Sequence, residues 1–329
     1  EVGGDGGAFG RPVEQFHEWC AQAASAWPQT MLTLSTHDTK RSADVRARIT
    51  LLAEIPAEWE AAVRRWGEHN DRYRSQGFPD RNLEYLIYQT LVGAWPIDTA
   101  RLSGFVVKAA REAGVHTSWL NPVVPYEDAA MQFTAAITSD AEFTADLESF
   151  IGRNQLVALG RTASLAQTTL LLTCPGVPDL YQGTEVWNLS LVDPDNRRPV
   201  DYAAHQRLLE EIRELGPEDV TARADEGVTK LWLIARLLAR RQERDGYTPV
   251  EAGGARAAHA VAFTRPGLFV LVPRLVARLG GDWGNTEVQL PPGRWTSVLT
   301  GDAYPGGTAI AVNELTRRFP VVVLEQTAS

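Results

Sequence analysis

The sequence has few of the residues that mark a disulfide-rich, membrane-spanning or nucleic-acid-binding protein. Its 329 residues include only two cysteines, Cys20 and Cys174, which are too few and too far apart for a disulfide framework. No window approaches ~18 uninterrupted apolar residues, the length of a membrane span. The formal net charge is −9 and no long basic stripe occurs, which argues against a nucleic-acid surface. We expect a globular, cytoplasmic protein with free thiols that binds neither nucleic acid nor a membrane.

Motifs that hold metals or cofactors are also missing. The sequence contains no glycine-rich phosphate loop, no paired-cysteine metal motif and no HExxH, and its six histidines do not cluster. We therefore predict no cofactor and no metal. Lysine is scarce as well, since Lys40, Lys108 and Lys230 are the only lysines among 32 basic residues. Each lysine is therefore an exception in a chain whose other basic residues are arginines, and the two residue types are not interchangeable chemically.

Tryptophan, by contrast, occurs ten times, which is frequent for this length. Aromatic platforms suit sugar rings, so a carbohydrate ligand is one interpretation of this abundance. The other interpretation is that the tryptophan side chains pack in the core. Trp59 and Trp66 lie on one apolar helical stripe, and we expect these two side chains in the core.

Apolar periodicity predicts helices through most of the first 245 residues. Between residues 42 and 150 no strand pattern of any strength occurs, so we predict an all-helical block of roughly one hundred residues. Proline and glycine divide this block at Pro56, 77–79, 95–96, Gly114 and 122–125. Further helices are expected over 12–27, 152–168, 203–215 and 228–244.

Two short apolar runs, 31–34 and 170–174, are typical of buried parallel strands whose carboxyl ends open into functional loops. After Gly246 the pattern changes to alternating segments that recur between Gly, Pro, Asp and Asn turns. Such spacing is typical of an antiparallel sandwich or barrel. A domain boundary is therefore expected near residue 245.

Three polar segments could carry chemistry. Residues 35–41 (STHDTKR) follow the first strand, where barrel enzymes keep their active sites, although Asp38 or Thr39 could simply cap the next helix. Residues 175–185 (PGVPDLYQGTE) are either a functional loop or a stiff turn. Residues 193–201 (DPDNRRPVD) are either a self-satisfied surface turn or an Asp/Arg pair that binds vicinal hydroxyls.

These segments, together with QTLVGAWP (89–96) and HTSW (116–119), point to a family. In this order they resemble the maltooligosyl trehalose synthase family of the α-amylase superfamily (glycoside hydrolase family 13). The resemblance covers essentially all 329 residues. The long strings are specific, whereas an isolated His-Asp pair would be a weak signal.

The resemblance implies an α/β fold, namely the C-terminal part of a (β/α)8 TIM barrel with strands 7 and 8, a large α-helical insertion and a C-terminal antiparallel β-sandwich domain. Strand 7 would end in His37-Asp38 and strand 8 in Pro175-Gly176. The implied domains are 1–45 (barrel segment with strand 7), 46–150 (helical insertion), 151–245 (barrel segment with strand 8 and following helices) and 246–329 (β-sandwich).

The resemblance also implies roles for individual residues. Asp38 matches the third invariant carboxylate of the superfamily, which binds hydroxyls of the reacting glucosyl ring, and His37 would hydrogen-bond the same ring. Lys40 would reach the glucose on the acceptor side. The remaining implied sugar-binding or pocket residues are Arg41, Tyr181, Glu185, Asp193, Arg197, Trp95 and Trp119.

The implied reaction converts the reducing-end α-1,4 bond of a maltooligosaccharide into an α,α-1,1 (trehalose) bond by intramolecular transglycosylation. Retaining α-glucan chemistry needs a nucleophile and a general acid roughly 5–5.5 Å apart. In this superfamily both lie on strands 4 and 5, which precede strand 7, and nothing in this sequence replaces them. The opening EVGGDGGAFG also reads like an internal loop.

The chain therefore looks like the C-terminal part of a longer enzyme, and alone we expect it to be inactive. Implied partners are the maltooligosaccharide, the missing N-terminal part of the same enzyme and a downstream maltooligosyltrehalose trehalohydrolase. Two alternatives stay open, which are another α-glucan transferase or hydrolase of the superfamily and a non-catalytic glucan-binding module.

Overall fold

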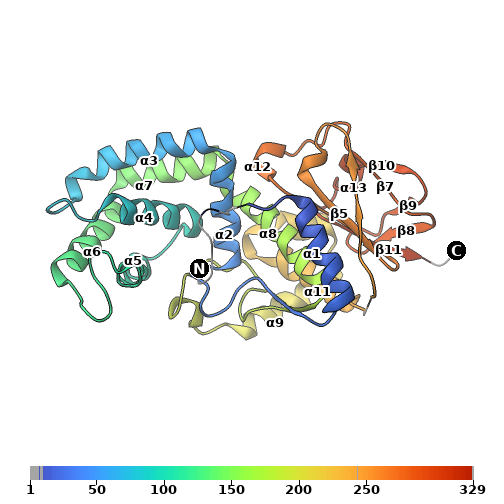
Figure 1. Cartoon of the computed structure of the whole chain (residues 1–329), viewed down its shortest axis with the longest axis horizontal. Helices are drawn as coiled ribbons and strands as arrows, with labels where there is room; N and C mark the ends of the chain where they lie inside the picture. The colour runs from blue at the N-terminus through green and yellow to red at the C-terminus, as the bar shows by residue number, and fades with distance from the viewer. Residues whose placement is uncertain (1–6, 8–9, 243, 328–329) are drawn as a thin grey trace. The chain divides into compact units, whose positions relative to one another are not determined.

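The computed structural model describes residues 7, 10–242 and 244–327 (Figure 1). The chain forms two compact units. Unit 1 comprises 1–36, 162–188 and 199–329, and unit 2 comprises 37–161 and 189–198. The fold is mixed helix and strand, as predicted, and the four-domain division stays a prediction.

Unit 2 contains the helices α2 (Ala43–Thr50), α3 (Pro56–Asn70), α4 (Arg81–Ala94), α5 (Thr99–Ala113), α6 (Val124–Ser139), α7 (Ala141–Arg153) and the first residues of α8 (Leu156–Thr173). The predicted helical block is confirmed, and the predicted breakers fall between these helices or in their first turns. α3 packs against α7 and α4 (Figure 1).

Local signals set the ends of these helices. The side chains of Asp80, Asp98 and Asp140 accept backbone N–H bonds in the first turns of α4, α5 and α7, which satisfies donors that a helix start leaves unpaired. Gly114 ends α5 in the left-handed conformation at φ 66°. Helix boundaries in unit 2 therefore follow from short-range sequence.

An aromatic cluster forms the core of unit 2. Trp59 and Trp66 are 7% and 1% exposed, so their predicted place in the core is confirmed. The Trp66 ring contacts those of Tyr88, Phe143 and Phe150, which come from α4 and α7. This cluster holds α3, α4 and α7 together.

Unit 1 contains a parallel pair of strands, β1 (Met31–Thr33) and β2 (Val177–Asp179). β1 lies within the predicted run 31–34, but it is not buried, since Met31 is 66% exposed. The strand predicted over 170–174 is wrong, because α8 continues to Thr173 and the strand starts only at Val177. The helix predicted over 152–168 also has different bounds, since α8 runs from Leu156 to Thr173.

The close approach of β1 and β2 requires a glycine at position 176. Gly176 has φ +133°, and a Cβ there would lie 2.6 Å from Cγ of Leu32 and 2.8 Å from the Thr30 carbonyl oxygen. The Val177 N–H donates to that same carbonyl at 2.8 Å. A larger residue would force the strands apart.

The other elements of unit 1 are α1 (Val13–Ala26), α9 (Tyr202–Glu211), α10 (Pro217–Ala222), α11 (Val228–Ala239), α12 (Val276–Leu279), α13 (Val312–Leu315) and two antiparallel sheets. The helix predicted over 203–215 breaks after Glu211, and the one over 228–244 ends at Ala239. Six 3₁₀ turns are described across the chain: Leu51–Glu54, Asp71–Tyr73, Asp195–Arg197, Ile212–Glu214, Ala224–Glu226 and Ala257–His259.

The antiparallel strands predicted after Gly246 are confirmed. One sheet has the order β3-β5-β6-β11-β8-β9 and the other β10-β7-β4. Their strands are β3 (Thr248–Val250), β4 (Ala252–Gly253), β5 (Ala260–Arg265), β6 (Leu268–Pro273), β7 (Glu287–Gln289), β8 (Arg294–Ser297), β9 (Ala303–Pro305), β10 (Ala309–Ala311) and β11 (Val322–Thr327).

The central strands of the six-stranded sheet contribute to two cores, because successive side chains of a strand point to opposite faces. In β6, Leu268 and Val270 join a core that includes Trp232 of α11, whereas Phe269 and Leu271 join a core with Val288 of the smaller sheet. Among the described residues, no helix combines the length and apolarity needed to cross a bilayer.

Candidate functional site

The segment His37–Arg41 follows β1 in the sequence and begins unit 2. His37 and Asp38 form a turn in which His Nε2 lies 3.4 Å from the Asp carboxylate, and their side chains are 53% and 83% exposed. The alternative in which Asp38 or Thr39 caps the next helix is wrong. Ser42 is the cap, because its Oγ accepts from the Val45 N–H of α2.

A second segment of unit 2, residues 189–198, binds this turn. The Asn196 side chain donates to the His37 carbonyl oxygen at 2.8 Å, and the Ser42 N–H donates to the Ser190 carbonyl oxygen at 2.9 Å. Arg41 forms an isolated antiparallel bridge with Leu191. The two segments are some 150 residues apart in sequence, and each contains predicted site residues. These contacts place them side by side.

One face of α5 holds both segments. Arg101, Phe105, Lys108 and Glu112 are spaced by four, three and four residues, which places them on one side of the helix. The Arg41 guanidinium lies 5.5 Å from the centre of the Phe105 ring. The other three residues make ion pairs or hydrogen bonds to 37–41 or 189–198.

Asp195 anchors the 189–198 segment. Arg101 donates from Nε and Nη2 to its two carboxylate oxygens at 2.8 and 2.9 Å, and the Leu191 N–H donates to one of them at 2.7 Å. Burial alone would raise the pKa of Asp195, but these hydrogen bonds outweigh it and hold the pKa below its usual 3.8. The carboxylate is thus stabilised in its charged form.

This anchor predicts a pH-dependent loss of stability for Asp195→Asn. Because the folded pKa is lowered, the stabilisation is present above the unfolded value near 4 and is lost as the pH falls through the folded value. We expect the variant to lose about 2 kcal/mol at pH 7 and progressively less below pH 4. Urea midpoints at pH 7, 5 and 3.5 measure this difference. The exposed Asp128 of α6, changed to Asn, controls for loss of a charge, and a pH-independent difference would contradict the assignment.

Lys40 and Arg197 complete the group that the structure brings together. Lys40 Nζ lies 2.9 Å from Glu112, and Arg197 Nε lies 2.8 Å from the Asp193 carboxylate. Lys108 donates to the Asp193 carbonyl oxygen at 2.8 Å. The predicted residues His37, Asp38, Lys40, Arg41, Asp193 and Arg197 therefore belong to one connected network.

The three predicted aromatic residues are placed differently. Trp95 follows α4, and its Nε1 donates to Glu148 of α7 at 3.2 Å. Trp119 is 56% exposed and carries the Arg111 guanidinium 4.9 Å from its ring centre, so it lies beside the end of α5. Tyr181 and Glu185 belong to unit 1, where Glu185 lies 3.6 Å from His205.

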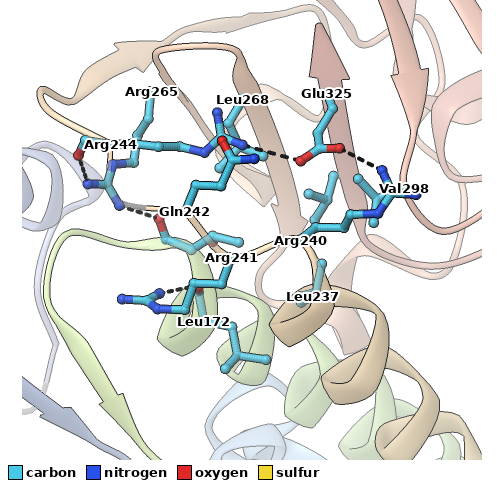
Figure 2. Close-up of a pocket in the computed structure, with 12 residues that line it drawn as sticks. Leu172, Leu237, Arg240, Arg241, Gln242, Arg244, Arg265, Leu268, Val298 and Glu325 are labelled. Carbon is cyan, nitrogen blue, oxygen red and sulfur yellow. Dashed lines mark hydrogen bonds and ion pairs between the residues drawn. The ribbon is translucent and has the colours of Figure 1, made fainter. Parts of the chain in front are cut away.

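Unit 1 has a small cavity whose lining is rich in arginine (Figure 2). Arg240 and Arg244 bind the two oxygens of Glu325 at 3.1 and 3.2 Å, and Arg241 donates to the Leu172 carbonyl oxygen at 2.8 Å. The cavity measures about 30 Å³, room for about two water molecules. These arginines join the end of α11 to α8 and β11, and a sugar ring does not fit there.

Unit 2 also has a groove of about 740 Å³ between α3 and α4, lined by residues such as Arg64, Glu68 and Tyr85. None of the predicted site residues lines it. In the described part of the chain, no three His, Cys, Asp or Glu side chains gather to hold a metal ion.

The network on α5 offers hydrogen-bond donors and acceptors of several geometries. It contains carboxylates, an imidazole, two ammonium groups and several guanidinium groups, which suits a ligand that presents many hydroxyl groups. Sequence reasoning missed Arg101, Lys108 and Glu112. Lysine scarcity singled out Lys108, and helical spacing could have paired it with Glu112, but nothing in the sequence connects either residue with Lys40 or Asp193.

Known proteins resemble the chain over nearly its whole length. No family model matches the chain. A Mycobacterium tuberculosis protein named as a maltooligosyl trehalose synthase is 36% identical over 339 aligned positions, which cover 98% of this chain and 41% of that protein. The solved maltooligosyltrehalose synthase of Arthrobacter ramosus has a TM-score of 0.89 at 39% identity, over 99% of this chain and 42% of that one. The glycosyltrehalose synthase of strain DSM5389 has a TM-score of 0.83 at 32% identity.

The solved synthases share the mixed helix and strand architecture of this chain. Over practically its whole length, the chain is homologous to a part of maltooligosyl trehalose synthase. It spans about two fifths of the relatives that it matches.

Proposed function

We propose that the chain supplies the sugar-binding part of a maltooligosyl trehalose synthase, an enzyme that isomerises the reducing-end α-1,4 bond of a maltooligosaccharide to an α,α-1,1 bond. The observation that carries this proposal is the network on α5. It joins the two segments that resemble the sugar-binding segments of the family, in a chain that superposes on the Arthrobacter ramosus synthase with a TM-score of 0.89.

The parallel pair of strands supports a place in a larger barrel. β1 and β2 have three residues each, and two strands cannot close a barrel. Met31 and Val177 are 66% and 40% exposed, which leaves apolar surface on the strand pair that further parts of a barrel would bury. We assign β1 and β2 to strands 7 and 8 of a (β/α)8 barrel, whose other strands belong to the part of the relatives that this chain does not match. The two antiparallel sheets are assigned to a C-terminal β-sandwich domain.

In this assignment the chain's residues bind and orient sugar rather than break the bond. The nucleophile and general acid come from the unmatched part of the enzyme. Asp38 and His37 bind hydroxyls of the reacting ring, and these contacts strengthen as the ring flattens toward an oxocarbenium ion.

The released glucose must stay bound, turn over and attack through its own anomeric hydroxyl. Lys40 holds that glucose, and Arg41, Asp193 and Arg197 of the same network are further sugar contacts in this proposal. Retention gives the glucose a high effective concentration at the reacting carbon, and exclusion of water prevents hydrolysis.

Two further assignments follow. The buried thiols of Cys20 and Cys174 contact each other at 3.9 Å without a disulfide bond, and we propose a reducing, cytoplasmic location in which they stay reduced. The product of the proposed reaction would be the substrate of a maltooligosyltrehalose trehalohydrolase, which we propose as the next enzyme.

The test compares this chain alone with a chimera in which it replaces the matching 42% of the Arthrobacter ramosus synthase. With maltopentaose as substrate, we expect trehalose-ended product from the chimera and none from the chain alone, because the bond-breaking carboxylates are absent from it. Product at equal rates from the chain alone would overturn the division of roles. A folded chimera without product would overturn the proposed function.

A further inference from the structure

Glu112 is the carboxylate at which the lysines of the site meet. Its two oxygens lie 2.9 Å from Lys40 Nζ and 3.8 Å from Lys108 Nζ. Lys108 in turn donates to the Asp193 carbonyl oxygen at 2.8 Å. We propose that Glu112 is a positioning residue, which orients the Lys40 ammonium and, through Lys108, fixes it relative to the Asp193 segment. The proposal rests on the proposed function, in which Lys40 binds the acceptor-side glucose.

The chemistry of lysine makes such a residue necessary. A lysine side chain is a flexible four-carbon stem with a compact charge, and ordering it costs about 1.5–2 kcal/mol of rotamer entropy. Glu112 fixes the Lys40 side chain before a ligand arrives, so binding need not order it again. A preorganised ammonium binds a hydroxyl more tightly than a mobile one.

The choice of residues fits this role. Two of only three lysines in a chain with 32 basic residues contact the same carboxylate. Glu112 lies on the face of α5 that also carries Arg101, which binds Asp195. One helix therefore holds the turn with Lys40 and the segment with Asp193 at a fixed separation.

Stability alone does not account for the Glu112 contacts. The Lys40 and Glu112 side chains are 36% and 32% exposed, and ion pairs of such exposure add at most about 1 kcal/mol. We therefore expect Glu112→Gln to leave the melting temperature nearly unchanged. Its effect should fall on the position of Lys40 and on sugar affinity.

The scarcity of lysine makes a direct test feasible on the whole chain. Biosynthetic labelling with lysine enriched in ¹³C at Cε gives three NMR signals, which Lys→Arg variants assign. We expect Glu112→Gln to move the Lys40 and Lys108 signals and to leave that of Lys230, which is buried in unit 1, in place. Titration with D-glucose should move the Lys40 signal in the wild type, and in Glu112→Gln the dissociation constant should rise about fivefold, since ordering of one side chain is lost.

Glu60→Gln is the matched control, because Glu60 is an exposed glutamate of α3 that pairs with Arg64. It should change neither the three lysine signals nor the affinity. Unchanged glucose affinity in Glu112→Gln would overturn the positioning role while leaving the proposed function intact. If glucose does not move the Lys40 signal of the wild type, then Lys40 does not bind glucose. That result would overturn its role in the proposed function and, with it, the role of Glu112.

Discussion

Asp38→Asn is expected to lower kcat of the chimeric synthase about a thousandfold, or about 4 kcal/mol of transition-state stabilisation. The thermal midpoint of the isolated chain should stay within about 1 °C, since surface substitutions seldom change stability by more than about 0.5 kcal/mol. Initial rates of trehalose-ended product from maltopentaose and a calorimetric melt measure the two effects.

The structure explains why activity and stability should separate. The Asp38 side chain is 83% exposed and contacts the imidazole of His37 at 3.4 Å, and removing a charge at such an exposed position should change the stability of unit 2 little. In the proposed site that charge binds ring hydroxyls whose hydrogen bonds strengthen in the transition state, and a neutral amide cannot replace it.

Asp128→Asn serves as the control for this prediction, because it removes an exposed carboxylate from α6. It should leave kcat and the melting temperature unchanged. An Asp38→Asn rate within tenfold of the wild type would remove Asp38 from the catalytic site. A large drop in melting temperature would instead assign it a structural role.

Helix boundaries could be predicted from the sequence because their signals are local. Pro56 begins α3, Gly114 ends α5 and Asp98 caps α5, and each acts within one turn of chain. The alternating strands after Gly246 were predictable for the same reason.

The run 170–174 shows where local reasoning fails. Short apolar runs have no period that separates a buried strand from a buried helix. Leu171 and Leu172 are 5% and 3% exposed, as either structure would require, but they form the last turn of α8. The exposed face of β1 could not be predicted either, because burial of a strand depends on neighbours that are distant in sequence.

The candidate site also has one part that could be predicted from the sequence and one part that could not. The segments around Asp38 and Asp193 could be selected, since each gathers polar groups within a few residues. The face of α5 could not, because Lys40 meets Glu112 and Arg101 meets Asp195 across 72 and 94 residues of sequence. Charges at helical spacing are normally a solvated surface, and only the fold shows which ones meet a partner.

Trp66→Ala is expected to destabilise unit 2 by about 4 kcal/mol, the largest stability effect that we predict. Its ring is 1% exposed and lies 5.4–5.8 Å from the ring centres of Trp59, Tyr88, Phe143 and Phe150. The substitution would leave a cavity among these aromatic rings and break the hydrogen bond from Nε1 to Asp146. Because a few kcal/mol is a large part of a domain's stability, α3 should separate from α4 and α7 early in a urea titration.

Trp27→Ala provides the matched control, since Trp27 ends α1 with 69% exposure and its loss should cost less than about 0.5 kcal/mol. Urea unfolding followed at 222 nm reports the helices of both units, and a lower urea midpoint for Trp66→Ala than for Trp27→Ala distinguishes the two variants. Trp66→Phe, which keeps an aromatic ring but loses the Asp146 bond, should fall between the wild type and Trp66→Ala. A loss below about 1 kcal/mol in Trp66→Ala would contradict a packed aromatic core, because filling so large a cavity would require the surrounding rings to collapse at almost no cost.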